Sequence, residues 1–344
     1  MRLRTSDPER PGWRRVRQGR GFRLLDETGR PLGPAGKERV RALAIPPAWR
    51  DVWICPWPNG HLQAIGTDAA GRRQYLYHPE FRARQERAKH AHVRQAAAAL
   101  PRLRRSVEED LARRGLCRER VLACAARLLD LGFFRVGGDR YRRDNESYGL
   151  TTLLREHVRC SRGEVAFAYP GKSGNYITAS VVDEEVCRVV RALLRRRGGG
   201  DQVFAYWEGR AWHEVRAGEL NAYLREKAGV ELSAKDFRTW HATVLAAVAL
   251  AVSERAGRES VTARRRAVVR AVREVASYLG NTPAVCRASY IAPAVLERYA
   301  EGVTIAPALE RLGEHGVFGL PATQGAIERA VLDLLEEDGP SARG

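Results

Sequence analysis

Between residues 51 and 78 the chain alternates apolar and polar residues in three short runs. The runs are DVWIC at 51–55, HLQAIGTD at 61–68 and RRQYLYH at 72–78. Turn-forming residues separate them, Pro-Asn-Gly at 58–60 and Ala-Gly at 70–71. Alternation with period two between turn residues indicates strands, so this part of the chain is predicted to form a small antiparallel sheet.

Elsewhere the apolar residues mostly recur every three or four positions, which is the spacing of a helix with one buried face. A second pair of strands is predicted at EVAFAYP (164–170) and NYITASVV (175–182), with Lys172 at the tip of the turn between them. A helix at 36–44 should end before Ile45-Pro46-Pro47, and Pro101 is expected to begin a new helix after one over 80–100. Further helices are predicted at 118–134, at about 183–196, 216–228, 235–253 and 258–279, and at 326–337.

These elements predict an α+β fold of two domains. Residues 1–91 would form a small N-terminal domain with the antiparallel sheet, and residues 92–344 a larger, mainly α-helical domain with a small β-hairpin sheet. The Arg-rich first 35 residues are expected to be a basic, partly disordered arm with a short hairpin at 21–33. A C-terminal extension is expected from about residue 303.

Charge narrows the choice of partner. The 344 residues carry a formal net charge of +18, which predicts a polyanionic partner, most often nucleic acid, with an anionic membrane surface as the alternative. The sequence has no run of 18 apolar residues and begins without the apolar stretch of a signal peptide. A cytoplasmic, nucleoid-associated protein is therefore expected. Only five of the 59 basic residues are lysines, so a lysine marks a place where a removable proton is useful.

Several other chemistries are disfavoured. The six cysteines form no C-x-x-C pair and no Cys/His cluster with zinc spacing, and they are predicted to be reduced and mostly buried. Gly171-Lys172-Ser173 resembles the end of a phosphate-binding loop, but Ala166 stands where that motif has glycine. No cluster of Asp and Glu suggests a two-metal nuclease. No cofactor and no metal are expected.

Four short motifs carry the candidate chemistry. They are RVGxxxYxxxN beginning at Arg135, GKSG around Lys172, KDFRTW around Arg238, and NTPAxxxxSYI, which contains Asn281 and Tyr290. The last motif predicts the end of one helix, a restart at Thr-Pro and a short segment that presents Tyr290. Each residue alone is weak evidence, because most tyrosines and arginines have packing or surface roles. In type and order the motifs resemble those of type IB DNA topoisomerases, closest to the small poxvirus and bacterial enzymes, over about residues 36–301.

The residue types suit transient DNA cleavage. A tyrosine ester conserves the energy of the phosphodiester bond, so Tyr290 is the candidate nucleophile. Arg135 and Arg238 would stabilise the charged transition state, and Lys172 would protonate the leaving 5′ oxygen. The resemblance implies a 3′-phosphotyrosyl intermediate, swivelling of the free strand and relaxation of supercoils of both signs without ATP or a required metal. It also implies a monomer that closes around double-stranded DNA as a two-domain clamp, with residues 1–91 as its DNA-clamping part.

The family resemblance also suggests DNA contacts. Tyr75 and Tyr77 share one face of their strand. A buried tyrosine pair is the alternative, but the viral enzymes use a matching Gln-Tyr-x-Tyr on the side that faces the DNA groove. In the polar stretch 138–148, a helix could face the groove or be a solvated surface helix. The candidate DNA-binding residues are Arg72, Arg73, Gln74, Tyr75, Tyr77, Tyr141 and Asn145.

One departure from the family pattern, one histidine of undecided role and two alternative functions remain. Many relatives have histidine where this chain has Asn281, which can donate a hydrogen bond to a phosphate oxygen but carries no charge. His241 could assist the site from three residues beyond Arg238, or simply be packed. A tyrosine recombinase or integrase shares this core, although it usually has His-x-x-Arg where this chain has Lys235-Asp236-Phe237-Arg238. A non-catalytic basic DNA-packaging protein would explain the charge but not the motifs.

Overall fold

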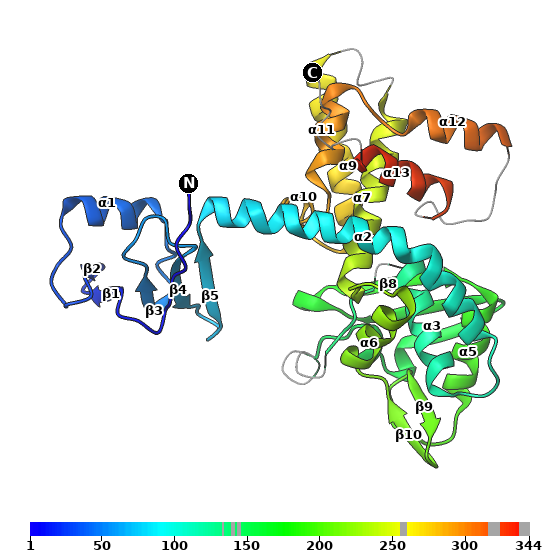
Figure 1. Ribbon diagram of the computed structural model, residues 1–344. Coiled ribbons are helices and arrows are strands. Elements are labelled where there is room, and N and C mark those ends of the chain that lie inside the picture. Colours follow the sequence, from blue (N-terminus) through cyan, green and yellow to red (C-terminus); the bar gives the residue numbers. More distant parts are fainter. Residues whose placement is uncertain (133, 139–141, 143–145, 255–259, 316–323, 337–344) are drawn as a thin grey trace. The chain divides into compact units, whose positions relative to one another are not determined.

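The structure is a computed structural model that describes residues 1–132, 134–138, 142, 146–254, 260–315 and 324–336. The chain divides into two compact units, Met1–Ala91 and His92–Gly344. The predicted α+β class is confirmed, because an antiparallel sheet lies in the first unit and the second is mainly helical (Figure 1).

The first unit is built on a five-stranded antiparallel sheet in the order β2-β1-β3-β4-β5. Its apolar face packs against the helix α1 (Pro34–Ala42) around buried residues such as Val40, Ile54 and Ala64. The three predicted strands are confirmed as β3, β4 and β5. The strands are β1 (Trp13–Gln18), β2 (Gly21–Leu25), β3 (Arg50–Ile54), β4 (Leu62–Thr67) and β5 (Arg73–Tyr77).

The prediction of a partly disordered N-terminal arm was wrong. β1 pairs with both β2 and β3, so the arginine-rich start of the chain belongs to the sheet. Trp13 and Leu24 pack against the core of the unit, and Arg15 donates hydrogen bonds to the carbonyl oxygens of Ile45, Pro46 and Trp49. The other arginines between Trp13 and Leu24 are exposed. The predicted hairpin is present, since the Leu32 N–H donates to the Leu24 carbonyl oxygen across a turn at 26–30. The high arginine content concealed a strand that is anchored by few apolar side chains.

A single helix, α2 (Pro79–Leu111), begins in the first unit and ends in the second. The predicted break at Pro101 was therefore wrong. Proline inside a helix costs about 3 kcal/mol because it removes a hydrogen bond and crowds the preceding turn. Here Ala97, Leu100 and Leu103 are almost fully buried on both sides of an exposed Pro101. This continuous buried stripe outweighs the local penalty.

The second unit contains a three-stranded antiparallel sheet, β6 (Val158–Ser161), β7 (Glu164–Pro170) and β8 (Tyr176–Val182), packed against α5 (Glu184–Arg195). A disulfide joins Cys160 on β6 to Cys187 on α5. The prediction that all six cysteines are reduced was therefore wrong for this pair. The prediction rested on the absence of two cysteines close together in the sequence. The packing of α5 on the sheet instead brings together two cysteines that are 27 residues apart.

Helix α7 (Ala234–Val252) lies at the centre of the remaining elements and packs against α3, α6, α9, α11, α12 and α13. Most of the predicted helices are confirmed to within a few residues, whereas the β9–β10 hairpin was not predicted. The other elements are α3 (Arg118–Leu131), β9 (Ala205–Glu208), β10 (Ala211–Glu214), α6 (Ala217–Ala228), α9 (Val261–Leu279), α10 (Pro283–Ser289), α11 (Pro293–Glu301), α12 (Ala306–His315), α13 (Ala326–Glu336) and the 3-10 turns η1 (Leu150–Thr152), η2 (Arg155–His157) and η3 (Lys172–Gly174). Among the described residues, no helix is both long and apolar enough to cross a membrane.

Candidate active site

Tyr290 lies in the link between the short helices α10 and α11, and the predicted helix end and restart at Thr-Pro before it are confirmed. Helix α9 ends at Leu279, and Gly280 takes the left-handed conformation (φ 61°) that stops the helix. Thr282 then caps α10, where its hydroxyl accepts a hydrogen bond from the Val285 N–H, and Pro283 occupies the first turn. Tyr290 follows the last residue of α10, so its ring leaves the backbone at a fixed point.

Arg238 lies on α7 and is almost completely buried, with 4% of its surface exposed. Its Nη2 donates a 2.8 Å hydrogen bond to the Leu279 carbonyl oxygen at the end of α9. The Cζ atom of its guanidinium lies 5.5 Å from the centre of the Tyr290 ring. The end of a helix carries partial negative charge, so this contact holds the guanidinium in place beside the phenol.

Arg135 and Asn281 meet although 146 residues separate them in the sequence. Arg135 Nη2 donates to Asn281 Oδ1 at 2.8 Å. The Leu150 N–H in turn donates to the Arg135 carbonyl oxygen at 2.8 Å, and a side chain at Gly149 would come within 2.7 Å of that oxygen. Asn281 Nδ2 is buried and hydrogen-bonds to no atom of the described residues, so it is a donor available to a ligand.

Lys172 lies in the turn η3 between β7 and β8, which confirms its predicted place at the tip of a hairpin. It is exposed, and it lines the same pocket of about 280 Å³ as Arg135, Arg238 and Tyr290. Lys235, which lies one helical turn before Arg238 on α7, also lines this pocket. The structure thus brings four of the five residues that the sequence proposed as catalytic around one pocket, and the fifth, Asn281, is hydrogen-bonded to Arg135.

The charges around Tyr290 favour its ionised form. Burial raises the pKa of the phenol, but the positive charges of Arg238 and Arg135 and their hydrogen bonds outweigh burial, so the pKa lies below its ordinary value. Burial together with the charge of Arg135 lowers the pKa of Arg238 to about 10. The Arg238 guanidinium therefore remains charged at neutral pH, beside a phenol whose deprotonation is favoured.

Two α7 residues near the site have roles that the sequence left undecided or missed. His241 is 1% exposed and its Nε2 lies 3.8 Å from Asp130 Oδ1, so it is packed in the interior, as the more cautious interpretation expected. Thr243 was missed. Its hydroxyl accepts a hydrogen bond from the Ala292 N–H (3.1 Å) and lies 3.2 Å from the Tyr290 carbonyl oxygen. A buried threonine among apolar helix residues was the only local signal.

Replacing Thr243 by valine is expected to lower the free energy of unfolding by about 1–3 kcal/mol, since the buried Ala292 N–H loses its partner while the shape of the side chain is kept. Thr243→Ser retains the hydroxyl and should lose less. Urea unfolding of the two variants measures the difference. Equal stability of Thr243→Val and the wild type would show that the hydroxyl does not hold the segment after Tyr290.

The predicted DNA-contacting strand is β5, at the edge of the sheet of the first unit. Tyr75 is 45% exposed and stacks on Tyr77, with ring centres 6.2 Å apart. The pair therefore lies outside the core, whereas Leu76 packs inward. Gln74 lies on the same side of the strand as Leu76 and donates to Asp68 Oδ2 at 2.9 Å, and Arg72 pairs with the same carboxylate at 3.0 Å. Arg73 is exposed beside Tyr75.

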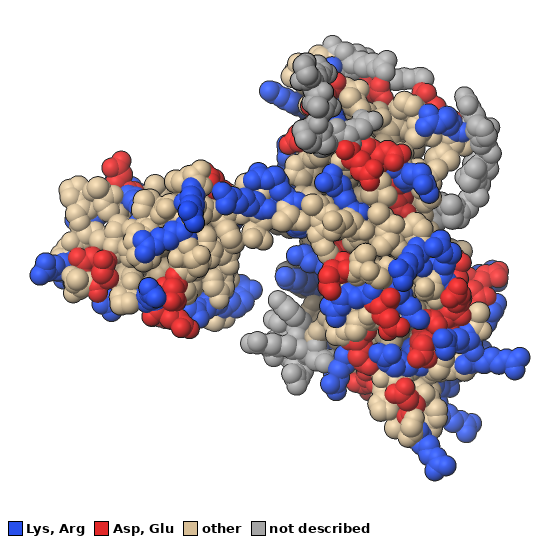
Figure 2. All heavy atoms as spheres, viewed as in Figure 1, with Lys and Arg blue, Asp and Glu red and all other residues tan. Residues whose placement is uncertain are grey.

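Tyr141 and Asn145, the other two candidate DNA contacts, lie outside the described residues. The overall distribution of charge does not indicate a DNA-binding face either. On the face seen in Figure 2, Lys and Arg side chains of the larger unit are interspersed with Asp and Glu. Within the described part of the chain, no group of three His, Cys, Asp or Glu side chains could hold a metal ion.

Comparison with known proteins gives two family matches. Residues 78–308 match the model for the catalytic core of eukaryotic DNA topoisomerase I, and residues 21–68 match the model for the N-terminal domain of bacterial DNA topoisomerase IB. DNA topoisomerase 1B of Acanthamoeba polyphaga mimivirus is 30% identical over 269 residues, which cover 76% of this chain and 79% of the viral protein. DNA topoisomerase I of monkeypox virus is 21% identical over 68% of this chain and 71% of its own length.

Proposed function

The chain belongs to the type IB DNA topoisomerase family, and on this premise we propose that it relaxes both positive and negative supercoils in double-stranded DNA without ATP. The observation that carries the proposal is the convergence of Arg135, Lys172 and Arg238 on the pocket that contains Tyr290. A phosphodiester placed there would meet a nucleophile, two fixed positive charges and a proton donor.

In the proposed reaction the Tyr290 oxygen attacks the phosphorus, and its proton passes to water. The bond from phosphorus to the 5′ oxygen breaks, which leaves a 3′-phosphotyrosyl ester and a free 5′ hydroxyl. Lys172 donates the proton that this leaving oxygen takes up. Religation is the reverse, with the 5′ hydroxyl as nucleophile and Tyr290 as leaving group. One ester replaces another of comparable energy, so no nucleotide is consumed.

Positive charge in the pocket supplies the stabilisation of the transition state. Arg135 and Arg238 are fixed by hydrogen bonds to Asn281 and to the end of α9, so they need little reorganisation when charge develops on the non-bridging oxygens. The buried Nδ2 of Asn281 is a further donor for a non-bridging oxygen. Because an amide is neutral, its contribution is smaller than that of a charged group.

The first unit is inferred to supply a second DNA-contacting surface, so that a monomer closes around the duplex as a clamp. The exposed, stacked Tyr75 and Tyr77 with Arg73 on the same side of β5 combine aromatic surface with positive charge. Such a strand can contact bases and phosphates in a groove. Gln74 would have to release Asp68 before it could contact a base.

The experiment that tests this function is relaxation of plasmid in excess EDTA without ATP. Negatively and positively supercoiled substrates are both expected to relax fully, because fixed arginines and a lysine supply the positive charge at the phosphate. Agarose gels resolve the topoisomers. Relaxation of only one sign, or relaxation that requires ATP or a divalent cation, would contradict the proposal.

A strand-exchange assay with two duplexes serves as the control for a recombinase. Recombinant products in place of relaxed topoisomers would favour the recombinase. Binding and compaction of the plasmid without any change in linking number would instead favour a packaging protein.

A further inference from the structure

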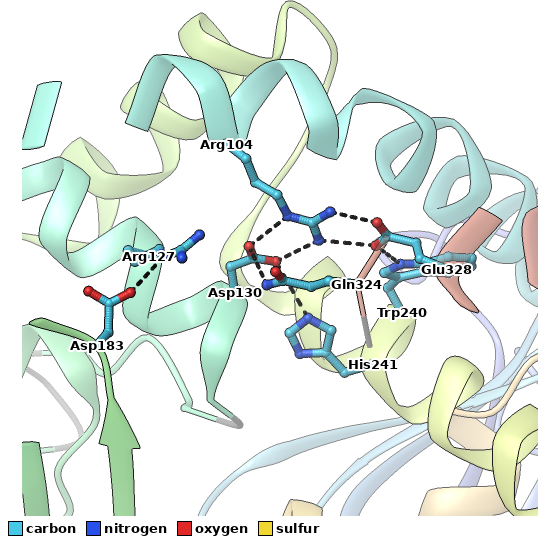
Figure 3. Close-up of polar contacts among 8 residues, drawn as sticks. All are labelled: Arg104, Arg127, Asp130, Asp183, Trp240, His241, Gln324 and Glu328. Atoms are coloured by element: carbon cyan, nitrogen blue, oxygen red, sulfur yellow. Dashed lines mark hydrogen bonds and ion pairs between the residues drawn. The ribbon is translucent and has the colours of Figure 1, made fainter. Parts of the chain in front are cut away.

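A buried cluster of charged and polar side chains lies beside α7 and joins four segments of the second unit (Figure 3). Arg104 from α2 is at its centre, between the carboxylates of Asp130 on α3 and Glu328 on α13. Trp240 and His241 reach the cluster from α7. All of these side chains lie in the interior. Among Arg104, Asp130 and Glu328, the side chain of Arg104 is the most accessible, and only 15% of it is exposed.

The hydrogen bonds of the cluster are short and numerous. Arg104 donates to both oxygens of Asp130 (2.8 and 2.9 Å) and to both oxygens of Glu328 (2.6 and 3.1 Å). Gln324 Nε2 donates to Asp130 at 2.9 Å, and Trp240 Nε1 donates to Glu328 at 2.6 Å. The C-terminal helix α13 is therefore bonded through one carboxylate to both α2 and α7.

Buried ion clusters of this kind specify geometry more than they add stability. Apolar side chains of similar volume would serve packing equally well, whereas any shift of one helix leaves a charge or donor unpaired in the interior. Trp240 can keep its bond to Glu328 only in one position of α7 along and around its axis. The cluster thus restricts where α7 can lie.

Helix α7 is also the element that organises the candidate active site. It carries Arg238, which lies beside the Tyr290 ring, and Thr243, which bonds the backbone on both sides of Ile291. Trp240 lies between these two residues in the sequence and is anchored by Glu328. A displacement of α7 would therefore move a positive charge and the nucleophile together.

We propose that Glu328 is a positioning residue for DNA cleavage, which acts through Trp240 to hold α7 where Arg238 and Tyr290 meet the scissile phosphate. This inference rests on the proposed function. It assigns the C-terminal extension a role in the catalytic step and not in DNA affinity. Misplacement of reacting groups by about 1 Å can slow a reaction by about 100-fold, so the predicted effect is large enough to measure.

The test compares Glu328→Gln with Asp333→Asn, which removes the same charge from an exposed position on the same helix. Enzyme in excess over supercoiled plasmid is stopped with detergent at intervals, and the rate of covalent complex formation is measured together with DNA affinity and Tm. Glu328→Gln is expected to form the complex at least about tenfold more slowly, with DNA affinity unchanged within about twofold. Asp333→Asn should match the wild type in all three.

Two further variants separate positioning from stability. Leu334→Ala removes a buried apolar contact of α13 but leaves the cluster intact, so at temperatures well below its Tm it should cleave at the wild-type rate. Trp240→Phe removes the N–H that binds Glu328, together with one ring of the buried indole, and should slow cleavage even if Glu328→Gln does not fold. A folded Glu328→Gln or Trp240→Phe that cleaves as fast as the wild type would overturn the inference. The inference would also be overturned if Leu334→Ala slowed cleavage as much as Glu328→Gln and Trp240→Phe do. Absence of any covalent complex with the wild type would instead overturn the proposed function.

Discussion

Tyr290→Phe is expected to abolish the covalent protein–DNA complex and plasmid relaxation while DNA binding is retained. The variant loses only the phenolic oxygen, which is the proposed nucleophile beside Arg238. Loss of a nucleophile lowers turnover by a factor on the order of 10⁴–10⁶ in well-studied covalent enzymes. Detergent trapping on supercoiled plasmid, followed by protease digestion and a gel, measures the nicked product directly.

Tyr299→Phe is the matched control for this change. It removes the hydroxyl of another tyrosine in the same part of the chain, one that is buried and contacts the Ser253 carbonyl oxygen at 3.5 Å. It should relax plasmid at the wild-type rate. Residual relaxation by Tyr290→Phe within about tenfold of the wild type would exclude Tyr290 as the nucleophile, since no such activity survives loss of the attacking atom.

Arg238→Ala is expected to lower the rate of covalent complex formation by about 10²–10³-fold, the usual cost of removing one fixed donor from a charged transition state. Arg238 is buried, charged at neutral pH and held by the end of α9, so water cannot easily replace it. Its positive charge also lowers the pKa of Tyr290. In the variant this pKa should rise, so the pH–rate profile should move towards higher pH.

Single-turnover cleavage across neutral and alkaline pH tests both parts of this prediction. Arg188→Ala is the control for charge alone, because Arg188 is an exposed arginine on α5 that pairs with Glu185 at 2.8 Å. It should leave the rate and its pH profile unchanged. A pH profile that moves to lower pH in Arg238→Ala, or a rate equal to that of the wild type, would contradict the proposed role.

The first unit illustrates where local sequence pattern is sufficient and where it is not. The strands around residues 51–78 were predicted correctly, because alternation and turn residues act over a few positions. The strand β1 was not, since Trp13 contributes to the core only once β1 pairs with β3 on one side and with β2 on the other. In the same way Pro101 was expected to end a helix, and burial of its neighbours kept the helix intact.

The candidate site shows the same division. Tyr290, Arg135, Lys172 and Arg238 could be proposed from short motifs, since each motif combines a reactive side chain with a local turn or helix. Three long-range contacts could not be predicted, because their partners lie 27 to 146 residues apart. They are the contact of Arg135 with Asn281, the hydrogen bonds of Thr243 to the segment around Tyr290, and the disulfide. Nothing in one sequence indicates which distant side chains will pack together.

By itself, the sequence determined the mixed fold class, most helices, and the types and order of the candidate site residues. These depend on interactions within a few residues, where spacing and residue type suffice. Only the tertiary structure decided how Arg238 and Arg135 surround Tyr290, and that Glu328 near the C-terminus is bonded to α7. Those arrangements depend on burial of polar groups that must find partners far along the chain, and the partners exist only after the helices have packed.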